Sequence, residues 1–139
     1  MWRAGSKRQE SRVDRWALVV DDSLTALRLV QAVFESEHYE VVTASDGMEG
    51  LEKVQQRLPD LIVTDSVMPG VDGFAFLRKL KENPVTRMIP VIMLTSGDLS
   101  DSKSQGAESQ PDVFVTKSAE MQPLLNQARS LLERPQQNR

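Results

Sequence analysis

Residues 61–70 constrain the fold more than any other part of this sequence. They read Leu-Ile-Val-Thr-Asp-Ser-Val-Met-Pro-Gly, so strand-forming residues lead directly into one carboxylate, and a Pro-Gly turn follows. A short apolar run bounded by turn signals is typical of a buried strand. The polar end of such a strand lies at the carboxyl edge of the sheet, where open α/β sheets bind ligands. We therefore predict that Asp65 is the centre of a functional site.

Short apolar segments with strand composition recur along the chain and alternate with segments of helical periodicity. The sequence predicts five strands, at residues 16–20, 39–44, 61–64, 91–94 and 112–116, and five helical segments. Strands that alternate with helices in this way form a parallel sheet with right-handed crossovers and helices on both faces.

Capping residues indicate where helices begin. Ser23 is the predicted N-cap of a helix that runs to His38, and Asp46 with Glu49 is predicted to form a capping box. Asp72 opens a further helix. We interpret these two aspartates as caps and turn formers. The single imidazole of His38 lacks converging partners, so we interpret it as a surface or helix-end residue.

Four of the five predicted strands end in polar residues. Parallel strands share one carboxyl edge, so side chains at these ends converge although they are distant in sequence. The residues expected to meet there are Asp21, Asp22, Asp65, Thr95 and Lys117.

This set of side chains suits phosphoryl transfer. Three carboxylates in one crevice repel one another, and a hard divalent cation such as Mg²⁺, which takes oxygen ligands and keeps several waters, relieves that repulsion. Asp65 can attack phosphorus to form an acyl phosphate. Mg²⁺ and the Lys117 ammonium can neutralise charge on the phosphoryl oxygens, and the Thr95 hydroxyl can donate to one of them. Glycine-rich phosphate loops, zinc-spaced His/Cys sets and a Ser/His pair are absent.

Composition excludes several classes of protein. The length of 139 residues suits one domain, and the net charge of -3 predicts neither nucleic-acid nor membrane binding. No apolar run approaches the roughly 18 residues of a membrane span. The absence of cysteine excludes disulfides and thiolate metal sites and fits a cytoplasmic location.

The two ends of the chain are expected to lie outside the folded part. Residues 1–15 are predicted to be a flexible leader, and residues 134–139 a polar tail. The leader is basic but lacks the apolar segment of a secretory signal. A basic docking arm is the alternative to a simply solvated leader.

Four motifs in order resemble those of the response regulator receiver domain, the phospho-accepting half of two-component signalling. They are Val-Val-Asp-Asp at 19–22, Thr-Asp-Ser-Val-Met-Pro-Gly-Val-Asp-Gly at 64–73, Leu-Thr-Ser at 94–96 and Phe-Val-Thr-Lys at 114–117. The predicted domain covers residues 16–133. The resemblance implies a flavodoxin-like three-layer α/β/α fold with a five-stranded parallel sheet in strand order 2-1-3-4-5.

The resemblance also implies a phosphoacceptor and metal site. Asp65 would accept a phosphoryl group from a histidine kinase or phosphotransfer protein. Asp22, Asp65 and the Val67 carbonyl would bind Mg²⁺, and Asp21 would assist through a water molecule. Val67 and Gly97 stand where the family tunes loss of phosphate. Neither side chain can orient a hydrolytic water, so we expect an acyl phosphate that is not unusually short-lived.

The remaining implied roles come with two departures from the family pattern. Thr95 and Lys117 would hold the phosphoryl group, and Phe114 would be the aromatic residue whose rotamer reports the switch together with Thr95.

The family usually has a cis proline after this lysine, whereas Ser118 follows here. A cis bond without proline costs about 3–4 kcal/mol, so we predict a trans bond and a different loop path. Residues 97–111, where the family's fourth helix belongs, hold little apolar area, and this helix should be short, frayed or mobile, with an altered output face.

We therefore expect a phosphorylation-dependent signalling switch rather than an enzyme with turnover on an external substrate. A downstream effector protein or domain is the expected output partner, with no direct nucleic-acid binding and a monomeric or weakly dimeric state. No DNA-binding or enzymatic output domain fits in this length. Two alternatives stay open. An aspartyl-phosphate phosphatase is opposed by Val67, which stands where such enzymes place a second Asp. A receiver-like adaptor that works without phosphorylation is opposed by the complete acidic set.

Overall fold

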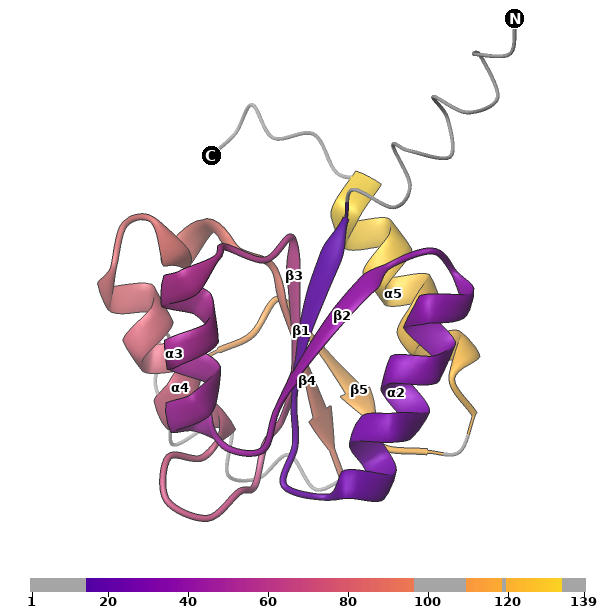
Figure 1. Ribbon diagram of the computed structural model, residues 1–139, viewed down its shortest axis with the longest axis horizontal. Coiled ribbons are helices and arrows are strands. Elements are labelled where there is room, and N and C mark those ends of the chain that lie inside the picture. Colours follow the sequence, from indigo (N-terminus) through magenta and orange to yellow (C-terminus); the bar gives the residue numbers. More distant parts are fainter. Residues whose placement is uncertain (1–14, 97–109, 119, 134–139) are drawn as a thin grey trace, which may run out of the picture.

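The computed structural model describes residues 15–96, 110–118 and 120–133. Its strands form one parallel sheet in the order β2-β1-β3-β4-β5, which confirms the predicted flavodoxin-like topology (Figure 1). The strands are β1 (Trp16–Val20), β2 (Glu40–Ala44), β3 (Leu61–Asp65), β4 (Val91–Thr95) and β5 (Val113–Thr116).

Helices cover both faces of the sheet, as the sequence predicts. They are α2 (Leu24–Ser36), α3 (Gly47–Gln56), α4 (Gly73–Glu82), the short 3₁₀ helix η1 (Thr86–Met88) and α5 (Gln122–Glu133). Figure 1 shows α3 and α4 on one face and α2 and α5 on the other. Every residue of β1, β3 and β4 is buried, because helices cover both faces of these central strands.

The core is two apolar clusters, one on each side of the sheet, and successive strand residues contribute to them in turn. On the α3–α4 side the cluster includes Leu18, Ile62, Phe76 and Met93. On the α2–α5 side it includes Val19, Phe34, Val63 and Ile92. Apolar packing therefore stabilises the sheet on both faces, and polar groups lie at the amino and carboxyl ends of its strands.

The helix caps lie next to the carboxyl edge of the sheet. The Ser23 hydroxyl accepts a hydrogen bond from the Ala26 N–H (3.2 Å) and Asp46 accepts from the Glu49 N–H (2.8 Å), so both are N-caps as predicted. Asp72 likewise caps α4. Of the two hydrogen bonds in the predicted capping box, the one that the Glu49 side chain accepts is wrong. The Glu49 carboxylate accepts from the Ser45 N–H (2.8 Å), one residue before the expected donor at position 46.

His38 lies just beyond the end of α2. The helix ends at Ser36, two residues earlier than predicted. His38 is exposed and has a left-handed backbone with φ 73°, and its N–H donates to the Glu35 carbonyl (3.0 Å). These contacts confirm the interpretation of His38 as a helix-end residue.

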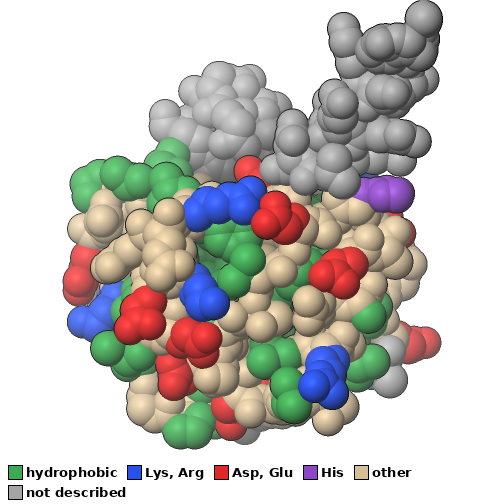
Figure 2. Space-filling model, in the orientation of Figure 1, with side chains coloured by type: hydrophobic (Ala, Val, Ile, Leu, Met, Phe, Trp, Pro, Cys, Tyr) green, Lys and Arg blue, Asp and Glu red, His purple; other side chains and the backbone are tan. Residues whose placement is uncertain are grey.

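Several expectations concern segments outside the described residues. The leader up to residue 14, the tail at 134–139 and positions 97–109, with the predicted short helix and Gly97, are among them. Within the described ranges no peptide bond is cis, so the bond from Lys117 to Ser118 is trans as predicted. No helix in those ranges is long and apolar enough to cross a membrane. Figure 2 shows acidic and basic side chains interspersed on one face.

Candidate functional site

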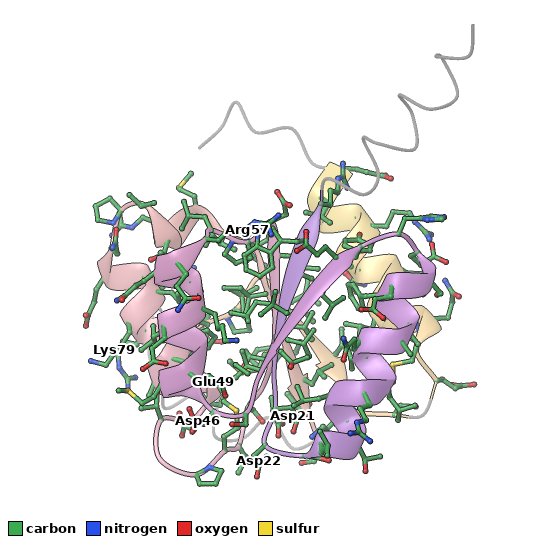
Figure 3. The ribbon with its side chains drawn as sticks, in the orientation of Figure 1. Asp21, Asp22, Asp46, Glu49, Arg57 and Lys79 are labelled. Atoms are coloured by element: carbon green, nitrogen blue, oxygen red, sulfur yellow. The ribbon has the colours of Figure 1, made fainter. Side chains whose placement is uncertain are left out.

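The carboxyl ends of four strands meet at one edge of the sheet, at the bottom of Figure 1. Asp21 and Asp22 follow β1 directly, Asp65 ends β3, and Lys117 follows β5. Figure 3 shows Asp21 and Asp22 at this edge. One carboxylate oxygen from each of the three aspartates lies within 4.8 Å of the others. The structure thus brings the predicted acidic set together.

Asp21 is the most deeply buried of these acids, with 1% of its surface exposed. Its Oδ1 accepts a hydrogen bond from the Ser23 N–H (2.9 Å). Its Oδ2 is buried and forms an ion pair with the Lys117 ammonium at 3.0 Å, and within the described part of the chain no further group donates a hydrogen bond to it. A buried carboxylate oxygen that relies on one ion pair is costly unless another cation is close.

Asp65 is held in a fixed orientation and is 7% exposed. Its Oδ1 accepts from the Ser66 N–H (2.9 Å), and its Oδ2 accepts from Lys117 Nζ (3.1 Å). Burial, and after it the negative charge of Asp21, raises the pKa of Asp65, although Lys117 and the Ser66 N–H oppose this effect. The carboxylate is therefore well positioned but short of positive charge.

Lys117 reaches both buried acids from the end of β5. Its backbone N–H donates to the Thr95 carbonyl (2.6 Å), which fixes the start of the loop after the strand. Burial alone would lower the pKa of Lys117, but its contacts with Asp21 and Asp65 outweigh burial and raise that pKa. Ser118 in place of proline thus leaves the ammonium within reach of the site.

The donor set fits a divalent cation. Among the described residues, three carboxylates face one ammonium, so negative charge is in excess there. Oxygen ligands at short mutual distances suit a hard cation such as Mg²⁺. The Asp21 Oδ2 atom, buried without a hydrogen bond, and the exposed Asp22 are the groups that such an ion would satisfy. Val67 lies two residues beyond Asp65, in the loop after β3, with 74% of its surface exposed.

Thr95 lies on β4, the strand next to that of Asp65, and Phe114 lies on β5, one strand farther out. Asp65 pairs with Leu94 in the sheet, so the buried Thr95 stands one residue farther toward the carboxyl edge. Phe114 is half-buried, and its ring centroid lies 6.5 Å from that of Phe74, on the α3–α4 side of the sheet. Their predicted roles in holding phosphate and in switching stay predictions.

Sequence reasoning missed two backbone donors that orient the acids. The N–H of Ser23 holds Asp21, and the N–H of Ser66 holds Asp65. An aspartate followed two residues later by a helix cap favours an Asx turn, and this signal points to Ser23. The hydrogen bond from the Ser66 N–H could not be predicted, because every residue except proline has a backbone N–H.

Comparisons with known proteins agree with this architecture. Residues 17–129 match the family described as the response regulator receiver domain. Response regulator PleD of Caulobacter vibrioides is 45% identical over 114 residues, which are 82% of this chain and 25% of PleD. The chain therefore spans about a quarter of the length of PleD. Protein PilH of Pseudomonas aeruginosa is 33% identical over 115 residues, covering 83% of this chain and 95% of PilH.

A solved structure gives the same result in three dimensions. Response regulator protein TrrA of Thermotoga maritima, crystallised in complex with Mg²⁺-BeF, superimposes with a TM-score of 0.76 and 27% identity. The match covers 84% of this chain and 98% of that one. With the sheet order, the motif positions and these matches in agreement, the chain belongs to the response regulator receiver domain family.

Proposed function

We propose that this receiver domain is a switch in which Asp65 accepts the phosphoryl group. Receiver domains are signalling switches of two-component systems, and family membership implies contact with histidine kinases or phosphotransfer proteins. The observation that carries the assignment is the 3.1 Å contact between Lys117 Nζ and Asp65 Oδ2 inside the acidic cluster. This contact supports the proposal, because the Asp65 carboxylate and the Lys117 ammonium meet at the carboxyl edge.

The chemistry of transfer follows from these two groups. A carboxylate oxygen of Asp65 attacks phosphorus, and the new O–P bond forms as the bond from phosphorus to the donor's leaving atom breaks. The Lys117 ammonium stabilises the charge on the phosphoryl oxygens, and the Thr95 hydroxyl donates to one of them. The catalysis is limited to the domain's own phosphorylation and dephosphorylation.

Mg²⁺ is the proposed resident ion. Receiver domains bind Mg²⁺ at an acidic pocket, and the related TrrA was crystallised with Mg²⁺-BeF. Asp22, Asp65 and the Val67 carbonyl would hold the ion here, and Asp21 would assist through a water molecule. When bound, Mg²⁺ supplies positive charge that the acidic cluster lacks and that phosphoryl oxygens require.

The switch is proposed to run from Thr95 to Phe114. The two residues lie on adjacent strands, and Phe114 is half-buried beside Phe74, so its ring is not enclosed by the core. Phosphorylation would bias this aromatic ring between two positions. A downstream effector protein or domain would read the change. We further propose that the protein is cytoplasmic, which the absence of cysteine supports, and that it is a monomer or a weak dimer.

Mass analysis of the intact chain tests the phosphoacceptor. Wild type incubated with acetyl phosphate and Mg²⁺ should gain the mass of one phosphoryl group, and Asp65→Asn should gain none. Asp60→Asn, which changes an aspartate at the opposite edge of the sheet, is the matched control and should behave as wild type. No gain in wild type would favour the adaptor alternative, and turnover of a phosphate ester would favour a phosphatase.

The lifetime of the acyl phosphate is a second testable property of the site. The exposed Val67 side chain is apolar and cannot orient a water for attack on phosphorus. We propose an acyl phosphate that is not unusually short-lived, and Val67→Asn, which introduces a polar amide, should shorten it. Decay of the phosphorylated mass over time measures this, and equal decay in wild type and Val67→Asn would contradict it.

A further inference from the structure

The loop of residues 66–72 leaves the site directly after Asp65 and is tied down at both ends. The Ser66 N–H donates to the Leu94 carbonyl (3.1 Å), and the Ser66 carbonyl accepts from the Gly73 N–H (3.1 Å). Between these ties the side chain of Met68 is buried in the core, while Val67 is exposed. The loop is thus anchored to the sheet and to α4 on either side of the Val67 carbonyl.

Gly73, the first residue of α4, presses against the backbone at the end of β3. A Cβ atom at position 73 would overlap the carbonyl oxygen of Asp65 and lie 2.9 Å from Cα of Ser66. Both neighbours are backbone atoms, so no side-chain rotation relieves the overlap. Any larger residue here requires either α4 or the end of β3 to move.

Gly47, the first residue of α3, makes a similar contact with the far part of the loop. Its N–H donates to the Val71 carbonyl (3.3 Å). A Cβ atom at position 47 would lie 2.5 Å from that carbonyl oxygen and 2.6 Å from Cγ1 of Val71. Asp46 and Asp72 cap these two helices, so both helix starts are fixed by their own hydrogen bonds.

We propose that Gly47 and Gly73 are positioning residues for the Mg²⁺ site. Gly73 sets the backbone of Asp65, and Gly47 sets the loop that carries the Val67 carbonyl. The inference rests on the proposed function, because it assigns both groups to the metal. Mg²⁺ demands near-octahedral ligands at short distances, so a shift of a few tenths of an ångström in this backbone weakens binding.

Gly50 provides a matched control within α3. A Cβ atom there would lie 3.1 Å from the Phe76 ring and 3.3 Å from Cγ2 of Val20, which are core side chains rather than loop backbone. Gly50→Ala therefore changes helix propensity, as the other two glycine-to-alanine changes do, and it changes core packing without touching the loop.

The test is calorimetric titration of Mg²⁺ into the full chain, with folding checked by circular dichroism and urea unfolding. Gly73→Ala should weaken Mg²⁺ binding by about tenfold or more, the range found when groups that orient metal ligands are lost. Gly47→Ala should weaken it about threefold to tenfold, since it acts through the loop rather than on Asp65 itself. Gly50→Ala should stay within about twofold of wild type even if its stability changes.

Three results would overturn the inference. Folded Gly47→Ala and Gly73→Ala proteins that bind Mg²⁺ as wild type does would remove it, as would an equal loss in Gly50→Ala. If Gly73→Ala does not fold, Gly47→Ala decides alone. Failure of wild type to bind Mg²⁺ would overturn the proposed metal site together with this inference, whereas binding by wild type with unchanged variants would overturn this inference alone.

Discussion

The two edges of the sheet carry polar groups of opposite character. At the amino edge, the backbone N–H of Trp16 donates to Asp60 (2.8 Å), and its indole N–H donates to the Leu58 carbonyl (2.9 Å). Arg57, at the edge opposite the acids in Figure 3, pairs with Glu40 and lies 4.9 Å from the centroid of the Trp16 ring. These donors all find partners.

At the carboxyl edge, by contrast, Asp21 Oδ2 is buried without a hydrogen bond and Asp65 has a raised pKa. One ammonium serves both acids. Satisfied polar groups stabilise a fold, whereas a cluster with excess like charge costs stability and persists where a ligand or a reaction needs it. The polar groups of the amino edge therefore add to stability, whereas those of the carboxyl edge form the proposed functional site.

The largest expected effect is at the amino edge. Trp16→Ala should lower the free energy of unfolding by about 3–5 kcal/mol, because it empties a buried aromatic site and leaves the Leu58 carbonyl without its indole N–H donor. Urea unfolding followed by circular dichroism measures this. The Mg²⁺ affinity of the folded protein should stay near that of wild type. A stability loss below about 1 kcal/mol would contradict the structural role of this edge.

Removing the ammonium should expose the charge excess at the carboxyl edge. Lys117→Met should lower the free energy of unfolding by about 1–3 kcal/mol in chelator, less than for a fully buried pair because the Lys117 side chain is 33% exposed. Added Mg²⁺ should reduce the deficit, since a cation then offsets Asp21 and Asp65. Arg57→Met is the matched control, and its deficit should be below about 1 kcal/mol and insensitive to Mg²⁺. If Mg²⁺ changed the stability of both variants equally, the contrast between the two edges of the sheet would be contradicted.

Neutralising Asp65, the proposed phosphoacceptor, should instead stabilise the fold. Asp65→Asn should raise the free energy of unfolding at neutral pH without metal, because the raised pKa of Asp65 means that folding disfavours its charged form. Protonation removes this penalty. The advantage of the variant should therefore shrink as pH falls through the folded pKa and vanish near the ordinary value of 3.8. Urea unfolding across this pH range, in chelator, measures the trend.

Asp60 supplies the control for that experiment. Asp60→Ala removes the acceptor of the Trp16 N–H and should lower the free energy of unfolding by about 1 kcal/mol. The two aspartate substitutions are thus expected to act in opposite directions. Destabilisation by Asp65→Asn in metal-free buffer would contradict the view that the charged Asp65 lowers the free energy of unfolding.

The smallest effect is expected at Tyr39. Burial raises the pKa of this phenol above its ordinary value of 10.0, against the opposing influence of Arg15. The neutral phenol is therefore favoured in the folded state, and its contribution to stability is lost as pH rises from the ordinary value through the folded pKa. Tyr39→Phe should show a shallower alkaline loss of stability than wild type in thermal unfolding. Identical slopes would contradict the burial effect.

Much of the site could be predicted because its signals are local or topological. Residue type and spacing predict that Asp46 and Asp72 are helix caps, and the structure confirms both. The convergence of Lys117 on Asp65 followed from the shared carboxyl edge of parallel strands.

The remainder depends on distances between elements that the sequence does not contain. The contact of Gly47 with Val71 joins positions far apart in the chain and depends on how closely α3 approaches the loop. The choice of Ser45 as the donor to Glu49 depends on the path of the chain before the cap. The burial of Asp21 Oδ2 beside the Lys117 ammonium depends on which side chains surround it in the fold.

The most direct measurement is to locate the phosphoryl group. Borohydride reduces an acyl phosphate to an alcohol, so an aspartate that carried the phosphoryl group is recovered as homoserine, and peptide mass spectrometry identifies its position. After treatment with acetyl phosphate and Mg²⁺, the account predicts this conversion at Asp65 and at neither Asp21 nor Asp22. Conversion at either of those two acids, or at none of the three in a folded chain, would contradict it.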